Sequence, residues 1–205
     1  MVELLVTILI TGIVMSIVAA MFINVAKVAA NANGTNTRTS VAGNVMNEMS
    51  EVIRTAANNA IASSDDPDPA LVSGTTATVT LYSYVDTSPT APAPTKVTFR
   101  VDASGFVWED RVAATASGSY WVFTGATTSR NLGGPVSTTG FLTYLDQDNA
   151  EVIPGSGGLS LTQRNSISSI KVTVTIANNP TLGSDPVVLV NTIGMPNLLL
   201  TSKDT

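Results

Sequence analysis

Residues 4–23 read LLVTILITGIVMSIVAAMFI, and this stretch decides the architecture of the chain. It is 20 residues long and is interrupted only by Thr7, Thr11, Gly12 and Ser16. A helix of this length spans about 30 Å, which is the thickness of the hydrocarbon core of a bilayer. A secretory signal peptide would carry a basic segment before a shorter apolar run, whereas an acid precedes this run. The stretch therefore predicts a retained membrane-spanning helix.

The helix is expected to continue past the membrane-spanning length, to about Ile61. Apolar residues recur at steps of three and four, which makes one face of a helix apolar. The members of this face are Val41, Val45, Met49, Val52, Ile53, Ala56 and Ala60. Gly, Asn and Thr are poor helix formers, so NANGTNTRTS at residues 31–40 predicts a bend or local loosening. Pro67 and Pro69 cannot continue a helix.

From residue 77 onward the apolar residues recur with a period of two, which is typical of half-buried strands. Strands are expected at 77–85, 96–102, 105–111, 119–124, 140–145, 150–153, 158–163, 170–176 and 186–193. Turn residues lie between them, at 88–94, 102–105, 131–135, 146–150, 154–158 and 178–186. Because residues 187–190 are continuously apolar, strand 186–193 is predicted to be central in its sheet.

One long helix followed by a run of strands predicts the α+β class with an antiparallel sheet. The helix is apolar in its first half and amphipathic in its second half. It is expected to pack on the sheet through Val45, Met49, Val52 and Ile53. The predicted organisation is a helical stalk at 1–62, a linker at 63–76 and a β-rich domain at 77–205.

The composition excludes several classes of function. The chain contains no Cys and no His, so disulfides, zinc fingers, haem ligation and His-based triads are absent. Its 10 basic residues are scattered against 15 acids, so this chain alone is not expected to bind nucleic acid. No spacing of Ser, Lys or carboxylates suggests a nucleophile with its base, so neither enzymatic activity nor a cofactor is predicted.

Acidic residues cluster in DQDNAE, where Asp146, Asp148 and Glu151 offer the hard oxygen ligands that suit calcium. The motif lacks the Gly of a full EF-hand loop, and its last acid comes too early. A hairpin turn with Asx hydrogen bonds is therefore favoured over a calcium site. Two other clusters are interpreted as a helix-ending turn (Asp65, Asp66, Asp68) and as solvated strand-end charges (Glu109, Asp110, Arg111).

A single acid, Glu3, leads the apolar stretch, and a carboxylate at the bilayer centre would cost about 2.5–3.5 kcal/mol. Glu3 therefore needs a partner or a lipid headgroup. The segment MVELLVTILITGIVMSIVAAMF resembles the amino-terminal segment of type IV pilins and type II secretion pseudopilins, in the spacing of Glu3, Leu4, Leu5 and Gly12. The Glu of that family stands fifth in the mature chain. The resemblance thus predicts two further residues before Met1, or an alternative start at Met1.

A weaker resemblance extends into the carboxyl-terminal half. VMNEMSEVIRTA, FRVDASGFVWEDR, GFLTYLDQD, ISSIKVTVTI and VVLVNTIGMPNL follow in an order similar to J-type minor pseudopilins and W-type minor pilins. The family implies a helical stalk in a filament core with a β domain outside it. It also implies that Glu3 neutralises the amino terminus of a neighbouring subunit. Small residues at helical spacing would let stalks approach closely; they are Gly12, Ser16, Ala19, Ala26 and Ala30.

The resemblance predicts a structural subunit of a type IV pilus-like filament. Before assembly the chain would cross the cell membrane once, and after assembly it would lie in an extracellular filament at the cell surface. The implied partners are further copies of itself or other pilin subunits, and the pilus assembly machinery. Two alternatives stay open: a minor pseudopilin at the tip of a secretion pseudopilus, and a monomeric membrane-anchored adhesin-like module.

Overall fold

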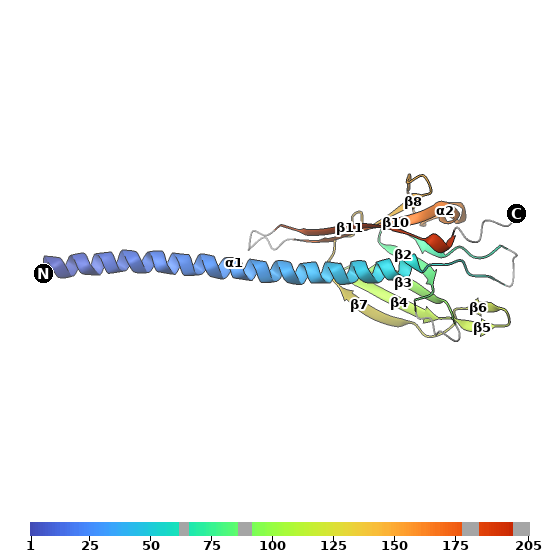
Figure 1. Cartoon of the computed structure of the whole chain (residues 1–205), viewed down its shortest axis with the longest axis horizontal. Helices are drawn as coiled ribbons and strands as arrows, with labels where there is room; N and C mark the ends of the chain where they lie inside the picture. Colours follow the sequence, from blue (N-terminus) through green and yellow to red (C-terminus); the bar gives the residue numbers. More distant parts are fainter. Residues whose placement is uncertain (62–65, 86–91, 178–184, 199–205) are drawn as a thin grey trace.

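The computed structural model describes residues 1–61, 66–85, 92–177 and 185–198. One long helix, α1 (Val2–Arg54), projects from a domain of antiparallel sheets packed around its carboxyl-terminal part (Figure 1). The predicted α+β class is confirmed. The turns expected at 88–94 and 178–186 lie largely outside the described residues.

The β domain contains two sheets and an attached hairpin, and all strand pairs are antiparallel. The five-stranded sheet has the order β1-β2-β3-β4-β7, with β1 (Leu71–Gly74), β2 (Thr78–Ser83), β3 (Thr95–Val101), β4 (Val107–Ala113) and β7 (Thr128–Gly133). The four-stranded sheet has the order β11-β10-β8-β9, with β8 (Leu142–Asp146), β9 (Glu151–Val152), β10 (Ile167–Ile176) and β11 (Val187–Gly194). The hairpin joins β5 (Thr115–Ser117) to β6 (Tyr120–Val122), and two short helices are α2 (Leu161–Ser166) and η2 (Pro196–Leu198).

The core lies where α1 meets both sheets. Val45, Met49, Val52 and Ile53 are fully buried, as the sequence predicts. On one side α1 contacts β2 and β7, and on the other it contacts β10 and β11. Because burying each such side chain stabilises by about 1.5–3 kcal/mol, this stripe is a main attachment of the helix to the β domain.

The bend predicted at residues 31–40 is wrong, because α1 continues through that segment without a break. Hydrogen bonds of Arg38, both within the helix and to the β domain, compensate for the low helix propensity of this segment. Arg38 Nε donates to the Gly34 carbonyl at 3.1 Å, within the helix. Its Nη1 donates to the carbonyls of Ala177 and Asp185, each at 3.3 Å, at the end of the β10–β11 pair. Tertiary contacts thus overrule weak helix formers.

The helix also ends earlier than predicted, at Arg54 instead of near Ile61. The Thr55 hydroxyl donates to the Glu51 carbonyl at 2.8 Å and closes the last turn. The chain then becomes extended, and the Ala57 N–H donates to the Tyr82 carbonyl at 3.0 Å. The backbone after Arg54 thus pairs with β2 and does not continue the helix, and the sequence pattern does not reveal this pairing. The helix-ending role expected of the aspartates is wrong for Asp66 and Asp68, which lie well past Arg54, while Asp65 is outside the described residues.

Strand β11 is at the edge of its sheet, so the prediction that 186–193 is central is wrong. Its continuous apolar run divides between two faces. Val187 and Leu189 are half-buried on the side of the core, whereas Val188 and Val190 are 50% and 57% exposed. The central strand with alternating burial is β10.

The strand expected at 158–163 is also wrong, because helix α2 begins there. Ser160 and Gln163 form a capping box, in which the Ser160 Oγ accepts from the Gln163 N–H and the Gln163 Oε1 accepts from the Ser160 N–H. The S-x-x-Q spacing was the signal in the sequence. Strand β1 lies inside the predicted linker 63–76, and β5 and β7 are strands that the alternation pattern does not predict.

Candidate functional site

Residues 1–30, which are Met1 and the first part of α1, project away from the β domain, and every one of them is exposed. The large apolar side chains of this segment are Met1, Val2, Leu4, Leu5, Val6, Ile8, Leu9, Ile10, Ile13, Val14, Met15, Ile17, Val18, Met21, Phe22, Ile23, Val25 and Val28. Apolar residues cover the whole circumference of the helix, which is typical of a membrane span or a buried helix. By length and composition α1 is able to cross a membrane. We call residues 1–30 the projecting segment.

The three hydroxyl side chains within the projecting segment are satisfied by its own backbone. Thr7 Oγ1 donates to the Glu3 carbonyl and Thr11 Oγ1 to the Thr7 carbonyl, both at 2.8 Å. Ser16 Oγ donates to the Ile13 carbonyl at 2.7 Å. Polar groups that enter lipid or an apolar bundle must find partners internally. These three hydroxyls therefore add little cost to burial of the segment.

Glu3 and Gly12, the two predicted assembly residues, both lie on the projecting segment, but the structure does not bring them together. Nine residues at 3.6 per turn place them about 180° apart around the helix. Glu3 lies in the first turn of α1, where the helix dipole favours an acid. Among the described residues it forms no ion pair. A Cβ added at Gly12 would meet nothing within 4 Å, so the fold of one chain does not require a glycine there.

Four charged side chains tie α1 to the five-stranded sheet, and sequence reasoning missed this ion-pair cluster. Glu48 on α1 contacts Arg111 on β4 and Arg130 on β7, with N···O distances of 2.7 Å to both. Glu109 on β4 contacts the same two arginines at 2.9 and 2.7 Å. Each carboxylate therefore binds both guanidinium groups, and the cluster links one helix to two strands.

Glu109 is the buried member of the cluster, with a side chain only 1% exposed. The prediction that Glu109, Asp110 and Arg111 are solvated strand-end charges is therefore wrong. Strand β4 continues to Ala113, so the three residues lie within the strand. The hydrogen bond to Glu109 is the main cause that raises the pKa of Arg130. Arg111 lies two positions after Glu109 on the same strand, and Arg130 lies opposite Glu109 on β7. No local signal joined Glu109 to Arg130, because β7 was not predicted.

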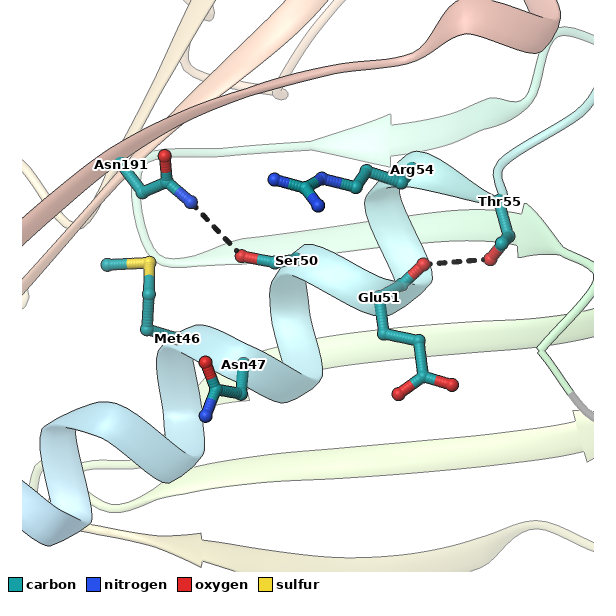
Figure 2. A pocket seen from close by; sticks show the side chains of 7 residues that line it. All are labelled: Met46, Asn47, Ser50, Glu51, Arg54, Thr55 and Asn191. Atoms are coloured by element: carbon teal, nitrogen blue, oxygen red, sulfur yellow. Dashed lines mark hydrogen bonds between the residues drawn. The ribbon is translucent and has the colours of Figure 1, made fainter.

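A groove runs between α1 and β11 on another side of the helix (Figure 2). Its lining residues are Met46, Asn47, Ser50, Glu51, Arg54, Thr55 and Asn191. The Asn191 Nδ2 donates to Ser50 Oγ at 3.3 Å across it. This contact holds β11 against α1, which is a structural role. Ion pairs thus join the helix to the five-stranded sheet, this hydrogen bond joins it to β11, and apolar packing joins it to both sheets.

The DQDNA segment forms the Asx turn that the sequence favours. The Asp146 Oδ1 accepts from the N–H groups of Asp148 and Ala150 at 2.9 and 2.8 Å. Asn149 takes a left-handed conformation with φ 61°. Glu151 begins β9. Among the described residues, no group of three or more acidic side chains is placed to hold a metal ion.

Calcium is expected to leave the melting temperature unchanged, because the Asp146 carboxylate is already engaged by the turn. The measurement is a thermal unfolding curve with the ion and with a chelator, compared between the native sequence and Asp148→Ala. A ligand that binds only the folded state must raise the melting temperature. A rise of several degrees that Asp148→Ala abolishes would show that the loop is a calcium site.

Deletion of residues 1–24 is expected to give a soluble, folded, β-rich fragment. The deleted residues are all exposed and contribute no side chain to the core. The remaining part of α1 keeps the buried stripe around Met49. Circular dichroism and gel filtration test this expectation. A fragment that is unfolded, or mainly helical, would refute the division of the chain into a stalk and a β domain.

The chain was compared with known families and proteins. No protein-family model matches it, and no curated protein matches its sequence significantly. The function proposed below therefore rests on the residues and the geometry described above.

Proposed function

We propose that the chain is a structural subunit of a type IV pilus-like filament, held in the membrane by α1 before assembly and polymerised through the same helix. The observation that carries this proposal is the projecting segment. It is a rigid continuation of a helix whose other end is fixed in the β domain, and its apolar surface is exposed on all sides. The motif around Glu3 adds the resemblance to pilins.

An exposed apolar helix of this size requires an apolar environment. Soluble monomers rarely expose contiguous apolar patches larger than a few hundred Å². Lipid supplies that environment for one chain, and a bundle of identical helices supplies it for many. The internally bonded hydroxyls of Thr7, Thr11 and Ser16 suit both environments equally. A subunit that moves from membrane to filament needs this dual compatibility.

Glu3 is the residue that distinguishes assembly from simple anchoring. A membrane anchor has no use for a carboxylate at the start of its span, where it costs up to about 2.5–3.5 kcal/mol if drawn into the bilayer. In a bundle, the same carboxylate attracts a cation from a neighbouring subunit and so favours one register over others. We therefore assign Glu3 a role in selecting how subunits dock.

A monomeric membrane-anchored module is the main competing function, because it requires the same apolar helix. A minor pseudopilin at the tip of a pseudopilus differs from the proposed subunit in copy number and not in mode of assembly. In the part of the β domain that the structure describes, no feature favours either function over the filament subunit. The three functions are separated by where the chain is found and in what amount.

The test is to express the chain, with its native upstream sequence, in cells that lack the endogenous copy. The sheared extracellular material is pelleted and compared with the membrane fraction. We expect the chain in both fractions, with many copies in the sheared pellet. Chain found only in the membrane fraction as a detergent-extractable monomer would support the anchored module. Trace amounts in filaments made mainly of another subunit would support a minor component.

A further inference from the structure

The projecting segment carries two charges of opposite sign, one near each end of its apolar region. Glu3 and Lys27 are both exposed, and residues 4–26 between them contain no charge. Among the described residues neither forms an ion pair. The next base along α1 is Arg38, and it is engaged by the carbonyls of Ala177 and Asp185. Lys27 is therefore the basic side chain of the projecting segment that is available to another subunit.

The two charges cannot meet within one chain. They are 24 residues apart in a continuous helix, which separates them by about 36 Å along its axis and about 120° around it. A helix can thus present Glu3 to a neighbour on one side and Lys27 to a neighbour on another side. When one patch of a molecule contacts a different patch on the next copy, the contact is head-to-tail. Head-to-tail contacts that do not close into a ring build open helical polymers.

We propose that Glu3 of one copy pairs with Lys27 of a second, parallel copy displaced by about 36 Å along the helix axis. The partner of this surface is therefore another copy of the same chain. The proposal rests on the filament function and deepens it, because it names a side-chain cation for Glu3, beside the amino terminus that the resemblance implies, and the stagger that this pair imposes.

An antiparallel dimer would also pair both charges, but insertion from one membrane excludes it. An antiparallel pair could join Glu3 to Lys27 twice in a closed dimer. Subunits inserted from one membrane keep all β domains on the same side, so their helices are parallel. Parallel helices in register would place Glu3 beside Glu3, and like charges repel. Only a stagger brings opposite charges together.

The surroundings of Lys27 permit close approach of a second helix. Small residues are frequent next to it, at Ala26, Ala29, Ala30, Ala32 and Gly34. The space beside Gly34 is also open, because a Cβ added there would meet no atom of the chain within 4 Å. The long Lys side chain can then reach past the small residues to a neighbour's Glu3.

Charge reversal tests the pairing. We expect Glu3→Lys and Lys27→Glu each to lower the sheared-filament yield by about tenfold or more, because each places like charges together. The double variant Glu3→Lys with Lys27→Glu should restore most of the yield, since it regenerates the pair with its polarity reversed. All three variants should remain in the membrane fraction, which shows that they are made and inserted.

A matched control moves the cation without changing the net charge. Lys27→Val combined with Val25→Lys shifts the charge by about 200° around the helix, and we expect filament yield to fall as in Lys27→Glu. Lys27→Arg keeps the charge in place and should assemble normally.

Two results would overturn the pairing. One is normal filament yield from Lys27→Glu alone, and the other is a double reversal that assembles no better than the single reversals. Neither would refute the filament function, which fails instead if the unaltered chain forms no filaments.

Discussion

Glu3→Val is expected to keep the chain in the membrane while lowering its filament yield by about tenfold or more. Removal of the carboxylate makes insertion easier, because the segment no longer carries an acid that costs about 2.5–3.5 kcal/mol at the bilayer centre. Assembly loses the charge that selects a register. The projecting segment itself is unaffected, since Glu3 makes no side-chain contact with the β domain among the described residues.

Two control variants separate the charge from other effects. Glu3→Asp keeps the carboxylate and should retain most of the filament yield. Thr7→Val removes a hydroxyl that is bonded to the Glu3 carbonyl within the same helix, so it should assemble normally. The measurement compares membrane and sheared fractions of each variant expressed as the only subunit. Normal filament yield from Glu3→Val would remove the assembly role of Glu3.

Glu109→Ala is expected to lower the free energy of unfolding of the β domain by about 1.5–3 kcal/mol, because it removes charged hydrogen bonds from a buried position. The substitution leaves two arginines around a buried position that is 1% exposed. Glu48 would remain as their acidic partner, but it cannot replace the hydrogen bonds that Glu109 accepts from the Nε–H groups of Arg111 and Arg130, at 2.9 and 3.0 Å. The lost hydrogen bonds are the main source of the loss, because Arg111 and Arg130 are 25% and 54% exposed and both keep Glu48 as a partner.

Asp110→Ala is the matched control for Glu109→Ala, because it removes the next carboxylate along β4. Asp110 pairs with Arg100, whose side chain is 39% exposed, at 2.7 Å. A pair in contact with solvent contributes only about 0–1 kcal/mol. Urea unfolding of the fragment that lacks residues 1–24, or of the full chain in detergent, gives both values. Equal losses for the two variants would show that the cluster has no special part in holding α1 to the sheet.

The helix and the general class were predictable because their signals are local. The apolar run at 4–23 is nearly continuous, and the stripe around Met49 recurs at helical spacing. Both signals can be recognised without knowledge of the tertiary arrangement. The Asx turn at Asp146 was predictable for the same reason, because its hydrogen bonds join neighbouring residues. The order of residue types within each segment was sufficient for these predictions.

The remaining features depend on partners distant in sequence. Where α1 continues through 31–40, Arg38 is bonded to the carbonyls of Ala177 and Asp185, about 140 residues away. The end of α1 depends on pairing with β2, and the edge position of β11 on the order of the strands. The ion-pair cluster joins Glu48 to residues of two strands, so no local pattern could reveal that Glu109 is buried.

The central claim is that α1 forms the core of a filament made of this chain. The most direct test is a helical reconstruction, by electron cryomicroscopy, of filaments sheared from cells that express it. The account predicts parallel α-helical density for residues 1–30 along the filament axis, with the β domains outside. Filaments in which the β domains contact one another while this segment remains outside the core would contradict it, as would the absence of filaments from cells that hold the chain in their membrane.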